Sequence, residues 1–67
     1  MKRLNQKELT VLELLSSGLT NEQIANELFL SPNTVKMYLK KIFEKLGVNN
    51  RVQAAVKAVS EHIMKEP

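Results

Sequence analysis

The sequence predicts an all-α domain of four short helices, over residues 6–17, 21–28, 32–46 and 51–64. Helix-starting signals recur before apolar runs of helical periodicity, and glycines follow two of these runs. No segment alternates apolar and polar residues with the period of two that a half-buried strand requires. The length leaves room for one small core, so residues 1–67 are expected to form a single domain.

Capping signals define the predicted helix starts. Asn5, Thr20 and Asn50 each have Glu or Gln three residues later, which is the spacing of a capping box. Ser31 precedes Pro32, a pair that suits an N-cap followed by proline at the first helical position.

The predicted helix ends are marked less uniformly. Gly18 and Gly47 follow the first and third apolar runs, where a left-handed residue would close each helix. Phe29 occupies the corresponding place after the second helix. A phenylalanine with positive φ would be strained there unless its ring packs to compensate.

Each predicted helix carries an apolar stripe, and the four stripes are expected to form one core. The stripe residues are Leu9, Val11, Leu12, Leu14 and Leu15; Ile24, Ala25, Leu28 and the nearby Leu30; Val35, Leu39, Ile42, Phe43 and Leu46; and Val52, Ala55, Val56, Val59 and Ile63.

The connection between the second and third helices predicts a helix-turn-helix. Residues 29–31 form a turn too short to reverse the chain easily into an antiparallel pair, and it suits two helices that cross steeply. The small side chain of Ala25 stands where the two helix axes would come closest. The helix-turn-helix is therefore expected at the centre of the domain.

Charge is distributed unevenly along the chain. The net charge is +3, but residues 8–30 carry −4 and residues 31–57 carry +5. A concentrated positive field favours a polyanionic partner, with nucleic acid ahead of a membrane. The alternative is a solvated cationic face with no partner.

The predicted third helix presents a polar, basic face opposite its apolar stripe. Met37 lies nearly opposite the stripe, so it should be exposed, and Lys36, Lys40 and Lys41 flank it. In a major groove the thioether could lie against a thymine methyl while the lysines reach guanine edges or phosphates. These lysines could otherwise form an ordinary solvated helix face.

Several classes of function lack the residues they need. There is no cysteine and one histidine, so no thiolate or imidazole metal cluster is available. No phosphate loop or paired acid–base motif occurs, so we expect neither an enzyme nor a cofactor or small-molecule ligand. No apolar run of 18 residues exists, which predicts a cytoplasmic protein without membrane contact.

An ordered set of residues over about 4–58 resembles the LuxR/GerE-type DNA-binding domain. The matching segments are Leu4-Asn5-x-Lys7-Glu8, Val11-Leu12-x-Leu14-Leu15-x-x-Gly18-x-Thr20-Asn21-x-x-Ile24-Ala25, Leu28-x-Leu30-Ser31-x-x-Thr34-Val35-Lys36 and Ile42-x-x-Lys45-Leu46-Gly47-Val48-x-x-Arg51-x-x-Ala54. Sigma-factor region 4 has a similar helix-turn-helix, but the last segment favours the LuxR type. The sequence departs from the family pattern at Asn5, Thr10 and Tyr38, which replace a common Thr, acidic residue and His.

The resemblance implies that the third helix enters the major groove of double-stranded DNA. It implies base contacts by Lys36, Met37 and Lys40. It also implies contacts to the DNA backbone by Thr20, Asn21, Asn33, Thr34, Lys41 and Arg51. Tyr38, which stands where the family commonly has His, could reach a phosphate through its hydroxyl. The expected function is transcription regulation, and RNA polymerase is left open as a further partner. The alternative is a protein-interaction module that uses the same fold without specific DNA binding.

The resemblance further implies a homodimer formed through the last helix on an inverted repeat. Ala54 and Ala58 are four residues apart, on the flank predicted to face away from the core, with Glu61 and His62 nearby. Two small residues at this spacing would let two helices approach closely. A solvent-exposed alanine face is the alternative.

Overall fold

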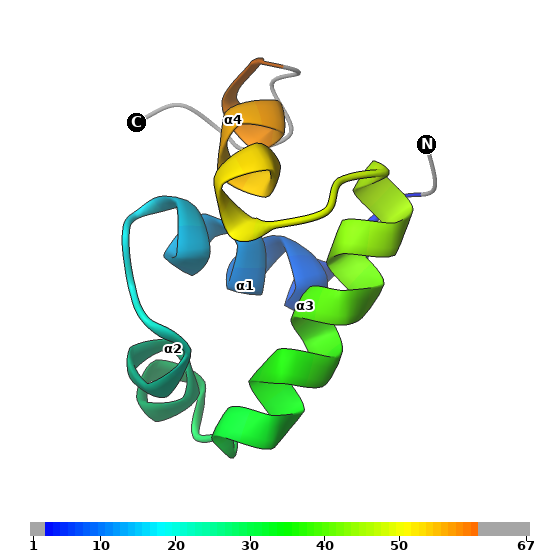
Figure 1. Cartoon of the computed structure of the whole chain (residues 1–67). Coiled ribbons are helices and arrows are strands. Elements are labelled where there is room, and N and C mark those ends of the chain that lie inside the picture. Colours follow the sequence, from blue (N-terminus) through cyan, green and yellow to red (C-terminus); the bar gives the residue numbers. More distant parts are fainter. Residues whose placement is uncertain (1–2, 61–67) are drawn as a thin grey trace.

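The computed structural model describes residues 3–60, which fold into four helices joined by short connections (Figure 1). The helices are α1 (Gln6–Ser16), α2 (Asn21–Leu28), α3 (Pro32–Leu46) and α4 (Arg51–Ser60), and this part of the chain contains no strand. The predicted all-α class, with α2 and α3 as a central helix-turn-helix, is therefore confirmed. The expected continuation of the last helix over 61–64 lies outside the described residues.

The first two capping boxes form as the sequence predicts. Asn5 Oδ1 accepts from the Glu8 backbone N–H at 2.8 Å, and the Glu8 carboxylate accepts from the Asn5 N–H at 2.8 Å. Thr20 and Gln23 exchange the same pair of bonds at 3.2 and 2.8 Å. These side chains satisfy amides that a helix start otherwise leaves without a partner.

The third and fourth helices begin with simpler arrangements. Ser31 Oγ accepts from the Thr34 N–H at 3.1 Å, directly before Pro32. Asn50 Oδ1 accepts from the Gln53 N–H at 2.9 Å, but the Gln53 side chain accepts from the Asn49 N–H instead of the Asn50 N–H. The capping box predicted at Asn50 is thus only half formed.

Phe29 ends α2 in the left-handed conformation, with φ 56° and ψ 43°. The positive φ that the short turn requires is present, but the ring is 95% exposed and does not pack to compensate. Backbone hydrogen bonds hold the turn instead, because both Phe29 and Leu30 donate to the Ala25 carbonyl. The strain, on the order of 1 kcal/mol or more, is therefore offset by the helix-turn-helix as a whole.

The core lies where α1, α2, α3 and α4 meet, and α3 packs against each of the other three helices. The stripes predicted for the first three helices supply most of it, with Leu14, Leu28, Leu30 and Phe43 only partly buried at its margin. The buried apolar residues are Val11, Leu12, Leu15, Ile24, Ala25, Val35, Leu39, Ile42, Leu46, Ala54 and Ala58.

The face of α4 that enters the core is not the predicted one. Ala54 and Ala58 are fully buried, whereas Val52, Val56 and Val59 are 69%, 62% and 59% exposed. The small alanines let α4 pack closely on α1 and α3 of the same chain. The two alanines do allow a close helix approach, but the helices that approach α4 belong to the same chain.

Glu8 is a carboxylate buried inside the domain, 2% exposed, and it pairs with Lys45 near the end of α3. Lys45 Nζ lies 2.7 Å from Glu8 Oε1. Burial acts to raise the pKa of Glu8, but hydrogen bonds from Lys45 and the Asn5 N–H and the charge of Lys41 outweigh it. The pKa of Glu8 therefore lies below its ordinary value. The pair fixes α1 against the last turn of α3.

Candidate nucleic-acid interface

The outward face of α3 gathers the side chains predicted to read bases. Lys36, Met37 and Lys40 line one shallow surface together with Asn33, a predicted contact to the DNA backbone, and Met37 is 64% exposed as expected. The 15-residue helix α3 buries one face, which carries Val35, Leu39, Ile42 and Leu46, in the core. The opposite face, which carries Met37, stays exposed. The predicted exposure of Met37 is therefore confirmed, and Lys36 and Lys40 line the same surface, as the helical spacing indicates.

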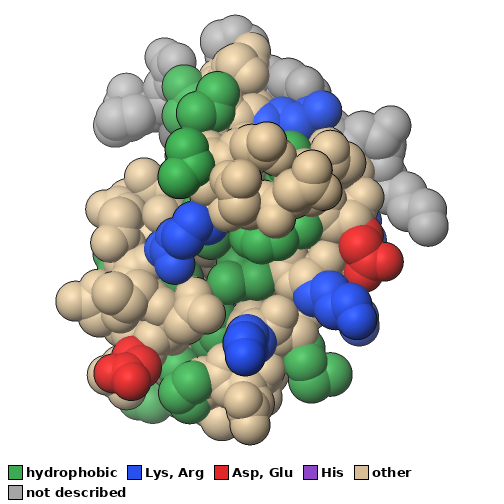
Figure 2. Space-filling model, viewed as in Figure 1, with side chains coloured by type: hydrophobic (Ala, Val, Ile, Leu, Met, Phe, Trp, Pro, Cys, Tyr) green, Lys and Arg blue, Asp and Glu red, His purple; other side chains and the backbone are tan. Residues whose placement is uncertain are grey.

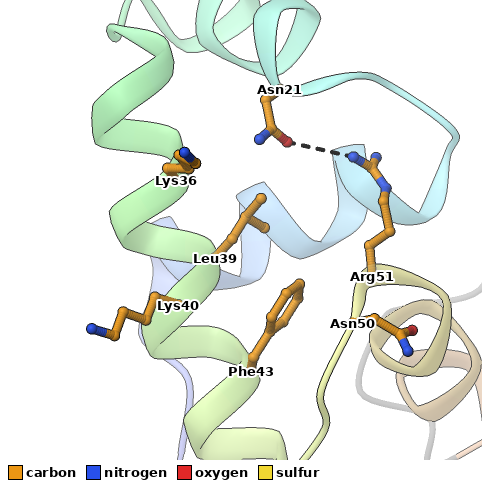
Figure 3. Close-up of a pocket in the computed structure, with 7 residues that line it drawn as sticks. All are labelled: Asn21, Lys36, Leu39, Lys40, Phe43, Asn50 and Arg51. Carbon is orange, nitrogen blue, oxygen red and sulfur yellow. Dashed lines mark hydrogen bonds between the residues drawn. The ribbon is translucent and has the colours of Figure 1, made fainter.

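A hollow of about 420 Å³ adjoins this face, between the starts of α2 and α4 and the middle of α3. Leu39 and Phe43 point into it from α3 and form an apolar floor (Figure 3). Lys36, Lys40 and Arg51 lie among its lining residues, which include no carboxylate. Figure 2 shows the Lys and Arg side chains around this region and acidic side chains toward its edges. The hollow suits an anion with an apolar part better than it suits a cation.

Arg51 links the two sides of the hollow. Its Nη2 group donates to the Leu19 carbonyl, in the connection between α1 and α2. Its Nη1 group donates to Asn21 Oδ1 at 3.4 Å, which is at the long end of hydrogen-bond distances (Figure 3). The guanidinium, predicted as a contact to the DNA backbone, thus already has two protein acceptors.

Other residues predicted to contact the DNA backbone lie at helix starts or along α3. Thr20 is exposed, with its hydroxyl engaged in the α2 cap. Thr34 is half-buried, and its hydroxyl lies 2.9 Å from Ser31 Oγ. Tyr38 is half-buried against the core, whereas Lys41 is exposed on the side of α3 nearer Glu8.

The structure therefore brings Asn21, Asn33 and Arg51 into one region with the three proposed base-reading residues. It adds Leu39, Phe43 and Asn50, which the sequence indicated only as core or cap positions. No sequence signal shows that core residues also floor an open hollow, because that depends on how far α4 stands from α3.

Two of the four residues predicted for the dimer interface are buried in the core of the same chain. Ala54 and Ala58 are wholly within the core, so their predicted place on the surface is wrong. Glu61 and His62 lie outside the described residues. The exposed side of α4 is occupied by Val52, Val56 and Val59 instead.

Comparison with known proteins gives the family. The sequence profile of the bacterial regulatory proteins of the luxR family, GerE, matches residues 2–58. The chain belongs to the LuxR family. The predicted resemblance is thereby confirmed, and membership in a family of regulatory proteins supports the expectation that the chain is not an enzyme.

Relatives of this LuxR-family domain are longer regulators. The DNA-binding transcriptional activator DevR/DosR of Mycobacterium tuberculosis is 53% identical over 53 residues, which are 79% of this chain and 24% of that protein. The transcriptional regulatory protein LiaR of Bacillus subtilis is 43% identical over 61 residues, 91% of this chain and 29% of LiaR. The chain thus spans less than a third of the length of either relative.

A solved structure shares the fold of this LuxR-family domain. The crystal structure of the response regulator ChrA, from a heme-sensing two-component system, superposes with a TM-score of 0.90 at 39% identity. The match covers 96% of this chain and 32% of ChrA.

The described part of this LuxR-family domain has neither a membrane-spanning helix nor a cluster of metal ligands. Within residues 3–60, no helix combines the length and apolar character needed to cross a bilayer. Over the same range, no group of three or more His, Cys, Asp and Glu side chains could hold a metal ion.

Proposed function

We propose that this domain binds double-stranded DNA in a sequence-specific manner, as the DNA-binding part of a transcription regulator. The exposed face of α3 carries the proposal, because Lys36, Met37 and Lys40 project from a helix whose other side is fixed in the core. A helix of this kind, following a short turn, fits a major groove. DevR/DosR, whose name describes a DNA-binding transcriptional activator, supports the same function.

The side chains divide by the part of DNA that each would contact. Lys36, Met37 and Lys40 face the groove and contact base edges. The flanking residues contact phosphates and fix the register of α3, and these are Thr20, Asn21, Asn33, Thr34, Tyr38 and Lys41. Arg51 differs from this second group because its guanidinium already has protein acceptors.

Selection of bound sites from a random DNA pool tests this division. The wild-type domain is expected to select a defined motif. Lys36→Ala should lose base preference at one position, because a bidentate lysine or arginine contact discriminates by about 1–3 kcal/mol. Lys41→Ala should select the same motif with weaker binding to all sequences. Equal losses on selected and random DNA for Lys36→Ala would contradict its base-reading role.

The exposed valines of α4 support a homodimer as the DNA-bound form. Val52, Val56 and Val59 follow one another at i, i+4 and i+7, so they form one apolar stripe along the helix. The occupant we propose is the same stripe of a second copy, since a 67-residue chain rarely builds a strong core without a partner. Two copies related by a two-fold axis would place their α3 helices in successive major grooves about 34 Å apart, on an inverted repeat.

Val56→Glu tests the dimer. The charge should make the domain monomeric in analytical ultracentrifugation at concentrations where the wild type is dimeric, because a buried unpaired carboxylate at the interface is costly. The motif selected from random DNA should then shrink to one half-site. Asn26→Glu, which adds the same charge at an exposed position of α2, is the matched control and should stay dimeric. A dimeric Val56→Glu protein would refute this interface.

A further inference from the structure

Arg51 and Asn21 meet across thirty positions of sequence, at the mouth of the hollow between α2, α3 and α4. Asn21 is the first residue of α2 and is half-buried. Arg51 is the first residue of α4 and is exposed. Their hydrogen bond, together with the bond from Arg51 to the Leu19 carbonyl, ties the start of α4 to the start of the helix-turn-helix.

The chemistry of this pair fixes the orientation of the Asn21 amide. A guanidinium has five N–H donors and no acceptor, so the amide atom that faces Arg51 must be the oxygen. The NH₂ group of Asn21 must then face the other way. Figure 3 shows it turned from Arg51 toward the side of the hollow where Lys36 lies.

An asparagine held in this way presents donors only, in a place where the lining residues include no carboxylate. Without Arg51 the amide could turn by half a rotation and present its oxygen, which would repel an anion. Arg51 has a planar fork, which suits it to hold two acceptors at a fixed separation; a lysine ammonium cannot reproduce that fork.

We propose that Arg51 is a positioning residue, which acts on DNA through Asn21: its fork holds the Leu19 carbonyl and Asn21 Oδ1, and so aims the Asn21 NH₂ group at a backbone phosphate. The inference rests on the proposed DNA-binding function. It differs from the contact that the family resemblance implies, in which Arg51 itself binds the phosphate. The two arrangements predict different affinities for Arg51→Lys, different salt dependences for Arg51→Met and a different energetic coupling between Arg51 and Asn21.

A double-mutant cycle on DNA affinity separates them. Asn21→Ala, Arg51→Met and the double variant are compared with the wild type on the selected site. Positioning predicts that each single variant loses roughly tenfold in affinity per half-site, as for one hydrogen bond to a charged group, and that the double variant loses no more than either. Additive losses would overturn the proposal, and a purely structural role of Arg51 in docking α4 would also give additive losses.

Arg51→Lys and the salt dependence supply a second discrimination. Positioning predicts that Arg51→Lys binds about as weakly as Arg51→Met, because the charge is kept while the fork is lost. It also predicts that Arg51→Met leaves the slope of log K against log[salt] unchanged. Near-wild-type affinity of Arg51→Lys, or a slope reduced by about 0.9 per half-site in Arg51→Met, would show a direct phosphate contact and overturn the proposal.

The free domain offers a readout that needs no DNA. In a ¹H–¹⁵N spectrum the side-chain NH₂ of Asn21 should have restricted mobility in the wild type and gain mobility in Arg51→Met. An unchanged Asn21 signal would overturn the positioning step. Failure of the wild-type domain to bind any DNA at low salt would instead overturn the proposed function and, with it, the phosphate part of the inference.

Discussion

Replacing Lys45 with methionine is expected to lower the free energy of unfolding by about 3 kcal/mol, most of what so small a domain can have. The variant leaves the Glu8 carboxylate buried with its ion-pair partner removed. Lys45 is itself 25% exposed, so part of its charge is already solvated, and the loss should fall at the low end for buried pairs. Urea denaturation followed by circular dichroism measures it.

Two controls isolate the ion pair. Lys40→Met makes the same change at an exposed position of α3 and should alter the free energy of unfolding by no more than about 0.5 kcal/mol. Glu8→Gln keeps an acceptor for Lys45 and the Asn5 N–H, so it should cost less than Lys45→Met. Equal losses for Lys45→Met and Lys40→Met would show that the pair does not stabilise the fold.

The same pair sets a pH dependence with a defined sign. Folding lowers the pKa of Glu8, so the folded state binds its proton less readily than the unfolded state does. The contribution of Glu8 is therefore complete above its ordinary pKa of 4.5 and is lost as pH falls below that value. In Lys45→Met, where desolvation is no longer outweighed by the ammonium, this acid-linked loss should shrink relative to wild type.

DNA affinity is expected to fall steeply with salt, by about 10³–10⁵-fold between 50 and 200 mM, if a dimer neutralises roughly 6–10 phosphates. The reason is the release of counterions condensed on DNA when lysines and arginines replace them. Fluorescence anisotropy with a labelled duplex, repeated over a salt series, measures the slope.

The rival function gives a different salt result. A protein-interaction module with this fold would show no DNA shift even at low salt, together with tight association with a protein partner. A flat response to salt in a domain that does bind DNA would contradict the electrostatic part of the proposal. Either result would be compatible with the fold, because the core contains none of the side chains proposed to contact bases.

Local signals predicted the helices well because each signal acts within one turn. The capping boxes at Asn5 and Thr20 satisfy amides only three residues away, so the chain spacing alone determines them. The position of Met37 followed from helical periodicity once the apolar stripe of α3 was known. The outward face of α3 was therefore predictable in outline.

The rotation of α4 was not predictable from apolarity. Valine is more hydrophobic than alanine, so the sequence favoured Val52, Val56 and Val59 as the core stripe. Close packing of α4 on α1 and α3 places the small residues Ala54 and Ala58 in the core instead. The exposed valines on the outer side of α4 are the observation on which the proposed dimer rests.

Contacts between residues distant in sequence could not be predicted from local sequence patterns either. Glu8 and Lys45 are 37 positions apart, and Asn21 and Arg51 are 30 apart. Each residue had a sufficient local explanation, as a cap, a family position or a surface cation. Only the three-dimensional structure shows that Lys45 forms an ion pair with buried Glu8 and that Arg51 already donates to two protein acceptors.

The left-handed turn at Phe29 has a mechanical consequence. Its ring is almost entirely in solvent, so it makes no packing contribution to the angle between α2 and α3. That angle is held by the left-handed backbone at Phe29, by the bonds to the Ala25 carbonyl and by the packing of the two helices on each other. The turn can therefore keep the angle between α2 and α3 with many different side chains at position 29, provided that the new residue accepts a positive φ. Glycine and asparagine meet that condition, whereas valine and isoleucine do not, because a β-branched side chain resists this conformation. A β-branched substitution at position 29 would thus change the orientation of α3 without changing any of the side chains proposed to contact DNA.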